Sequence, residues 1–258
     1  MRRLLAALSL LPLLACGSSR VSLTGEMRYG ATAEENFQAG VEEAKAEHWE
    51  EAAKLFEYVK TKYPFAKEAA LADLKLADLK FDQELYAEAA TAYQTFGQLH
   101  PGHELADYAR FRVARSLFDD APGDVMLFPP PYEKDQRTLR EAAKSLEEFL
   151  AAWPKSKYVP EAKKVLAEAR SRLAEHEWYA AGFYVSREKW PGAAGRLETL
   201  LKQYPGTPRE VEALFLLARS YEKMGERFRA QQTLQKLVAT HPDDPRRPEA
   251  ERLLATLR

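Results

Sequence analysis

Two histidines three residues apart have the side chains and spacing that could best hold a metal ion. His100 and His103 belong to the run His100-Pro101-Gly102-His103, and imidazole is a common ligand of transition metals. The only carboxylate close by in the sequence is Glu104, and no third histidine is near. Proline and glycine between the two histidines favour a tight turn. We therefore interpret the run as a turn and helix cap, and we expect no metal site and no cofactor.

Catalytic motifs are missing from the sequence. It contains no glycine-rich phosphate loop, no GxSxG nucleophile elbow and no HExxH metal pair. The only cysteine is Cys16, which excludes an intramolecular disulfide, a CxxC redox pair and a cysteine-based metal cluster. Lys and Arg (38) balance Asp and Glu (39), which argues against nucleic-acid binding. These observations predict a protein that is not an enzyme.

Cys16 ends an N-terminal segment that has the composition of a signal peptide. Arg2 and Arg3 precede an apolar run, 4–14, which is shorter than the roughly 20 residues that a spanning helix needs. The last four residues, Leu13-Leu14-Ala15-Cys16, resemble a bacterial lipobox. This resemblance implies cleavage between Ala15 and Cys16, a diacylglycerol on the cysteine and acylation of the new N-terminus. The alternative is an ordinary secretory signal with an incidental cysteine.

The residues after Cys16 indicate where such a lipid would be sorted. Residue 17 is Gly rather than Asp, which, by resemblance to enterobacterial sorting rules, implies the outer membrane. The segment 16–32 is polar and carries no helical stripe, so we expect a lipidated, flexible tether between the membrane and the fold.

The elements that follow the tether repeat one spaced pattern five times. An alanine is followed four residues later by a large apolar residue, three later by another, and four later by a ring next to a proline. The instances are Ala52/Phe56/Val59/Tyr63-Pro64, Ala89/Tyr93/Phe96/His100-Pro101, Ala142/Leu146/Phe149/Trp153-Pro154, Ala193/Leu197/Leu200/Tyr204-Pro205 and Ala230/Leu234/Leu237/His241-Pro242. Steps of four and three place one apolar stripe on a helix, and the proline ends that helix.

Small residues stand 24 positions before four of these prolines, where a partner helix must approach closely: Gly40, Ala77, Ala181 and Ala218. This spacing is similar to that of the tetratricopeptide repeat (TPR), although the typical Trp and Gly-Tyr positions are only partly filled. We predict an all-α, TPR-like α-solenoid of about five helix pairs with a C-terminal capping helix over 247–257. Stacks of this kind bind partners rather than convert substrates.

Two irregularities divide the repeat array. The third unit contains an insert, 119–134, with three consecutive prolines, which we expect to be a non-helical surface loop. It is either a tolerated insertion or a loop that contacts a partner. An unbroken apolar pattern then predicts one long helix over 160–187. The expected organisation is therefore a signal peptide, 1–15, the tether, 16–32, units one to three, 33–159, and the long helix with units four and five and the cap, 160–258.

Four segments resemble the BamD-type outer-membrane assembly lipoproteins over about 33–242. They are Tyr63-Pro64-Phe65; His100-Pro101-Gly102-His103 with Asp107-Tyr108-Ala109; Lys134-Asp135-Gln136; and Arg172-Leu173-Ala174-Glu175-His176-Glu177 leading into Tyr184. The family often has arginine where Lys134 stands, and its loop at the Pro-rich insert is shorter.

This resemblance implies a lipid-anchored scaffold of the β-barrel assembly (BAM) complex that faces the periplasm. Its implied partners are the barrel-forming subunit, which docks on the C-terminal repeats in the family, other BAM lipoproteins, and the targeting segments of unfolded outer-membrane proteins. The family's N-terminal repeats are proposed to receive those segments.

Three side chains are candidate partner contacts. Tyr58 stands off the buried stripe of its helix and could line a peptide groove, with Tyr29 lying over it. Arg196 precedes the inward Leu197 in an Arg-Leu-Glu run that the family shares, so we expect it outside, free to pair with an acidic residue of the barrel-forming subunit. Substituting Arg196 by Glu should then weaken docking without lowering the melting temperature. For each residue, the alternative is an ordinary packed or solvated side chain.

Other functions remain possible from the sequence. A secretin pilotin is also lipidated but tends to have more regular repeats. A Tol-linked cell-division coordinator usually has no lipobox and carries an N-terminal coiled coil, which is missing here. A cell-wall hydrolase is disfavoured because five repeat units leave no room for a catalytic domain.

Overall fold

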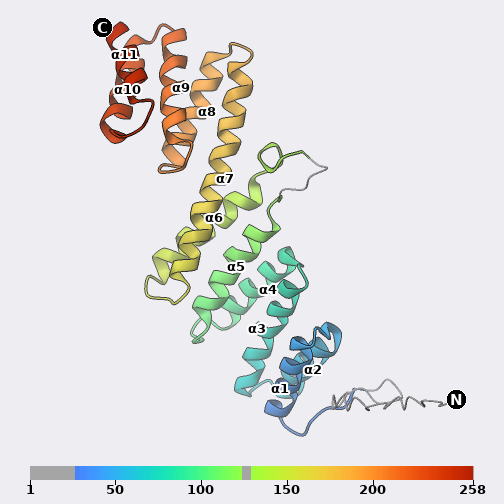
Figure 1. Ribbon diagram of the computed structural model, residues 1–258. Helices are drawn as coiled ribbons and strands as arrows, with labels where there is room; N and C mark the ends of the chain where they lie inside the picture. The colour runs from blue at the N-terminus through green and yellow to red at the C-terminus, as the bar shows by residue number, and fades with distance from the viewer. Residues whose placement is uncertain (1–26, 124–128, 258) are drawn as a thin grey trace, which may run out of the picture. The chain divides into compact units, whose positions relative to one another are not determined.

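The computed structural model describes residues 27–123 and 129–257, and within these ranges the chain is helical (Figure 1). Ala15 and Cys16 lie outside the described residues. The helices are α1 (Ala33–Lys45), α2 (Trp49–Lys62), α3 (Lys67–Asp82), α4 (Tyr86–Leu99), α5 (Ala106–Asp120), α6 (Arg137–Ala152), α7 (Val159–Val185), α8 (Trp190–Gln203), α9 (Glu210–Lys223), α10 (Arg227–Thr240) and α11 (Arg247–Thr256), with a 3-10 turn, η1 (Pro131–Glu133). The all-α, TPR-like prediction is confirmed.

Two compact units make up the chain, one ending at Ala69 and the other beginning at Ala70. The division that the sequence suggested, between 159 and 160, falls inside the second unit, at the start of α7. Within the described residues, no helix is both long and apolar enough to cross a membrane.

The five repeated stripes are the buried faces of α2, α4, α6, α8 and α10. Every alanine and both apolar residues of each stripe are no more than 1% exposed. Gly40 of α1 lies where an added Cβ would be 2.7 Å from the ring of Phe56 on α2. The small residue therefore sets how closely the two helices approach, as its spacing predicted.

Each of these helices ends in the same way. The ring residue before the proline has φ between −126° and −129° and ψ between 53° and 62°, outside the helical region. The proline ring disfavours the helical conformation in the residue before it, which explains why the helix stops there. The amide of the ring residue still donates to the carbonyl four residues back, at 2.8–2.9 Å. This bond satisfies one further carbonyl near the end of each helix.

The turn that joins the two helices of a pair also repeats. One residue in it adopts a left-handed conformation, with φ of 60° at Glu47, 61° at Glu84, 55° at Glu188 and 78° at Gly225. The next amide donates across the turn to the carbonyl five residues back, at 2.8–2.9 Å. This is the Schellman arrangement, whose left-handed position is usually glycine because a Cβ is strained there. Three of the four turns therefore hold a strained glutamate.

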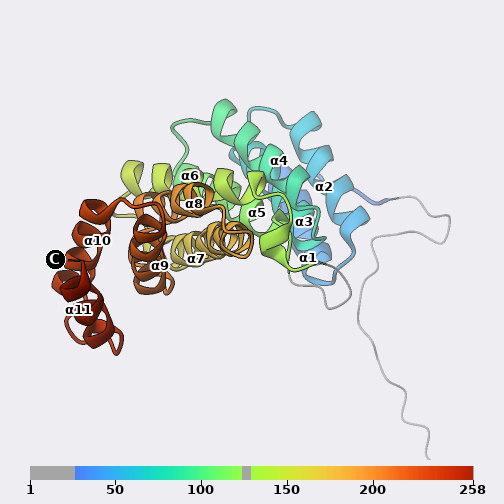
Figure 2. The ribbon, with the colours of Figure 1, turned by 90° about the horizontal axis from the view of Figure 1, so that it is seen from above.

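The second unit is organised around α7, which is 27 residues long. It packs against α6 along one part of its length and against α8 along another (Figures 1 and 2). Its buried residues join those of its neighbours in one apolar core. α11 covers the end of the array, with Ala250 and Leu257 buried, as the capping prediction required.

The described ends of the insert contain more helical structure than expected. Asp119 and Asp120 are the last residues of α5, and Pro131–Glu133 form η1, which packs on α7. The prediction that the whole of 119–134 lies outside helices is therefore wrong at both described ends. The cause is packing, because α5 continues until Ala121, itself buried, turns the chain away.

The strained turns yield a paired stability test. Glu188→Gly should raise the stability by about 0.5–1 kcal/mol, because relief of left-handed strain exceeds the extra entropy of glycine in the unfolded chain. Gly225→Ala should lower it by about 1 kcal/mol, because it adds the strain that the first change removes. Thermal unfolding measures both, and shifts in the same direction would contradict the assignment.

Candidate functional site

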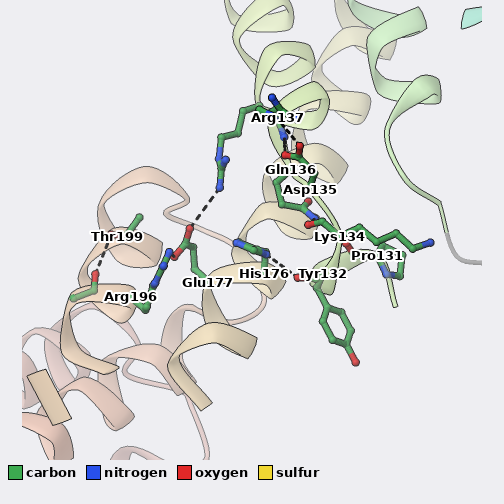
Figure 3. Close-up of polar contacts among 12 residues, drawn as sticks. Pro131, Tyr132, Lys134, Asp135, Gln136, Arg137, His176, Glu177, Arg196 and Thr199 are labelled. Atoms are coloured by element: carbon green, nitrogen blue, oxygen red, sulfur yellow. Dashed lines mark hydrogen bonds and ion pairs between the residues drawn. The ribbon is translucent and has the colours of Figure 1, made fainter. Parts of the chain in front are cut away.

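A buried carboxylate lies at the centre of the second unit. The Glu177 side chain on α7 is only 4% exposed, and its Oε2 lies 3.1 Å from Arg196 Nη1 on α8 (Figure 3). Its Oε1 lies 4.0 Å from Arg140 Nη2 on α6. Burial raises the pKa of the Tyr204 hydroxyl, and hydrogen bonding to Arg140 opposes that rise, so Tyr204 joins the same cluster. A buried charge needs such partners, because its desolvation is costly without them.

The turn of α7 that carries Glu177 also holds the insert and α9. His176 Nδ1 lies 2.7 Å from the Tyr132 carbonyl of η1 (Figure 3). Arg172 donates to the Pro122 carbonyl at 2.6 Å, and Arg209, at the start of α9, pairs with Glu175 at 2.7 Å. One short segment of α7, 172–177, therefore connects to α6, α8, α9 and the insert. It is also one of the four segments that carry the family resemblance.

The base of the insert is fixed by its own polar contacts. The Gln136 amide is buried and donates to the carbonyls of Pro131, at 2.7 Å, and Lys134, at 2.8 Å. Asp135 Oδ1 accepts the Arg137 amide at 2.9 Å, which satisfies a free donor at the start of α6. Lys134 reaches back to the Gly123 carbonyl at 3.2 Å. The Lys134-Asp135-Gln136 segment therefore shapes the end of the insert.

Arg196 is not the free cation that the sequence suggested. Its side chain is 43% exposed, but one guanidinium nitrogen is held by Glu177. Arg196→Glu would place a second carboxylate beside a buried one, so the expectation of an unchanged melting temperature is wrong on physical grounds. The exposed part of the guanidinium retains donors that could reach a partner, and partner binding by Arg196 stays a prediction.

Tyr29 and Tyr58 come together in the first unit, as the sequence suggested. Their rings stack with centroids 3.9 Å apart and planes 16° apart, and Tyr29 remains 43% exposed. The Tyr63 ring lies edge-on to Tyr58 at 6.1 Å. Whether this aromatic surface receives a peptide remains a prediction. In the structure, one face of Tyr58 is covered by Tyr29.

The chain segment 29–32 is fastened to α1 rather than free. Asn36, fully buried, accepts the Gly30 amide at 2.7 Å and donates to the carbonyls of Gly30, at 3.0 Å, and Thr32, at 2.6 Å. The Tyr63 hydroxyl donates to the Ala31 carbonyl at 2.9 Å. The tether expected over 16–32 therefore ends earlier than predicted, because a buried amide pairs with its last residues. We call the segment 29–32 the strap.

The two histidines of the opening motif lie in a helix end and a turn. His100 is the C-cap of α4, and its Nε2 lies 3.2 Å from Asp73 Oδ2. His103 Nδ1 accepts the Leu105 amide at 3.1 Å. Among the described residues, no group of three or more His, Cys, Asp or Glu is placed to hold a metal ion.

Sequence reasoning missed Glu177 and Asn36. Glu177 could have been found, because it stands on the stripe that Leu173 and Ala181 define at helical spacing, where a charge must be paired. Asn36 has a weaker signal, since a polar residue in the first turn of a helix is common.

Comparison with known proteins places this geometry in a family. A family model described as "YfiO: Outer membrane lipoprotein" matches residues 30–237. The chain belongs to this YfiO family. A YfiO relative, the "Outer membrane protein assembly factor BamD" of Neisseria meningitidis serogroup A (strain Z2491), is 25% identical over 95% of this chain and 93% of its own length. The protein of the same name from Haemophilus influenzae is 27% identical, covering 83% of this chain and 82% of its own.

Solved structures are similar at lower identity. The P58(IPK) TPR domain has a TM-score of 0.42 with 18% identity, covering 87% of this chain and 54% of that one. TTC0263, a TPR protein of Thermus thermophilus, has a TM-score of 0.36 with 17% identity, covering 88% of this chain and 98% of that one.

The buried carboxylate can be tested with a mutant cycle. Arg196→Gln should lower the stability by about 1–3 kcal/mol, because Glu177 is left buried with only Arg140 at 4.0 Å. Combining it with Glu177→Gln should recover most of that loss, since no buried charge remains. Denaturant unfolding of the four proteins gives the coupling. Strictly additive losses would show that the pair does not stabilise the fold.

The strap can be tested through its buried anchor. Asn36→Ala removes three hydrogen bonds and should speed hydrogen exchange of the Gly30 amide at least about tenfold, because that amide loses its acceptor. Glu35→Gln is the matched control, since an amide oxygen can still accept from Ala31. Equal exchange at Gly30 in the two variants would mean that Asn36 does not hold the strap.

Proposed function

We propose that the protein is a lipid-anchored scaffold of the β-barrel assembly complex, which faces the periplasm and aids the assembly of outer-membrane proteins. The observation that carries the proposal is the family match over residues 30–237, supported by relatives named as outer membrane protein assembly factors over most of their length. The lipobox at Leu13–Cys16 supports the anchor, with Cys16 as the acylated residue after cleavage behind Ala15.

The work of such a protein is binding rather than catalysis. A row of helix pairs presents extended surfaces, and ion pairs hold those surfaces in register without needing a reaction centre. The barrel-forming subunit, other lipoproteins of the complex and unfolded outer-membrane protein segments are the partners we propose. We assign the half-exposed Arg196 to the barrel-forming subunit, and the Tyr29–Tyr58 surface to unfolded segments.

The pattern of exposed charge supports this division of roles. In the second unit, Arg140 and Arg196 are each about half exposed, although both face Glu177. A guanidinium can bind one carboxylate within the chain and offer its remaining N–H groups to another. The partner would then bind an arginine that Glu177 already holds in place.

Affinity purification from detergent-solubilised membranes tests the proposal. The full-length tagged chain should recover an outer-membrane barrel protein with repeated periplasmic domains. The double variant Glu177→Gln/Arg196→Gln should recover less of it, because the fold persists while the guanidinium is lost. Arg219→Gln on α9 is a control, as it removes another surface arginine. Recovery of a secretin in place of the barrel protein would refute the assembly role and favour a pilotin.

A further inference from the structure

An open groove runs beside the C-terminal half of α7, on the side where the insert packs. It has a volume of about 490 Å³, within the range of sites that bind ligands. Its lining includes Tyr132 of the insert, Trp178, Tyr179 and Phe183 of α7, and the arginines Arg187 and Arg209. None of these residues takes part in the Glu177 cluster or in the Tyr29–Tyr58 surface.

The floor of the groove is aromatic and exposed. Tyr179 is 43% exposed and Phe183 is 48% exposed, although both lie on the helix that forms the centre of the unit. Gly182 stands between them, and an added Cβ there would meet no atom within 4 Å. Exposed rings around an open position form the kind of apolar surface that usually contacts another molecule.

The insert builds one side of the groove. The Tyr132 ring lies 4.9 Å from that of Tyr179, and hydrogen bonding to the Glu133 carboxylate raises the pKa of the Tyr179 hydroxyl. His176 holds the Tyr132 backbone from the other direction. The η1 end of the insert therefore has a defined place on α7, which favours a role for it over a merely tolerated insertion.

The two arginines of the groove, Arg187 and Arg209, differ in whether a carboxylate is paired with them. Arg209 is paired with Glu175 at 2.7 Å. Arg187 lies over the Phe183 ring at 3.6 Å, and its Nη1 donates to the Phe183 carbonyl and the Ser186 hydroxyl, both at 3.3 Å. Among the described residues, no carboxylate is paired with Arg187. The groove therefore combines exposed rings with an arginine that is paired to no carboxylate among the described residues.

We propose that this groove binds an extended peptide segment of a partner protein in which aromatic side chains stand next to carboxylates. Rings of the segment would stack on Tyr132, Tyr179 and Phe183, where an aromatic pair contributes about 0.5–1.5 kcal/mol beyond its buried area. A carboxylate would bind Arg187 through charge-assisted hydrogen bonds. A segment with lysines in place of the carboxylates would be repelled. The proposal does not depend on the assembly role.

Fluorescence anisotropy with defined peptides tests the proposal on the full-length protein. The probe is a labelled octapeptide with two phenylalanine–aspartate pairs flanked by serine and glycine, and its counterpart has lysine in place of aspartate. The acidic probe should bind with a Kd in the micromolar range, and the basic probe should bind at least about tenfold more weakly.

Variants then locate the binding. Gly182→Leu should fill the groove and weaken binding of the acidic probe at least about tenfold, whereas Gly97→Leu should leave it unchanged. Both glycines are helical with open space at the Cβ position, so neither change should unfold the protein. Arg187→Glu should reverse the preference, so that the basic probe becomes the tighter ligand.

Two outcomes would overturn the proposal. Equal affinity for the two probes would remove the role of Arg187, and an unchanged affinity in Gly182→Leu would place the binding elsewhere. Neither outcome bears on the assembly role, which is measured separately by recovery of the barrel protein.

Discussion

The second unit depends on one buried charge. Glu177 is almost fully removed from water, so its carboxylate is tolerated only while arginines from both neighbouring helices face it. Apolar side chains pack closely but without direction, whereas a carboxylate between two guanidiniums is stabilised only while its partners stay within reach. Glu177 therefore adds a directional contact between α7 and each of α6 and α8 to the apolar packing of the three helices.

The same turn of α7 combines this constraint with the attachment of the insert. Arg172 and His176 bond to backbone carbonyls of the insert, while Glu175 and Glu177 pair with arginines on the following helices. Glu175, His176 and Glu177 are consecutive, and successive residues of a helix project about 100° apart, so their side chains point to different sides of α7. Fewer than two helical turns of α7 therefore contact four elements: α6, α8, α9 and the insert.

Local physics made most of the fold predictable. The alanine and apolar stripes, the ring before each proline and Gly40 specify helices, their ends and their closest approach, because each acts within a few residues of the sequence. The strap, the docking of η1 and the pairing of Arg196 could not be predicted from such local patterns. Asn36, His176 and Glu177 bond to groups that the pattern does not place beside them. The proximity of Tyr29 and Tyr58 was anticipated because Tyr58 stands off the buried stripe of its helix and Tyr29 lies near the end of the expected tether, but the stacking of their rings was not.

The strap also limits how far the fold can stand from a lipid at Cys16. Gly30 lies fourteen positions after Cys16, and an extended chain covers at most about 3.3–3.6 Å per residue, or roughly 50 Å in all. Asn36 holds the chain at Gly30, so under the proposed lipid anchor the first helix pair would stay within this distance of the membrane. Confinement of this kind raises the local concentration of the first unit near membrane-bound partners. The buried Asn36 side chain would thus limit the volume in which the first unit can meet its partners.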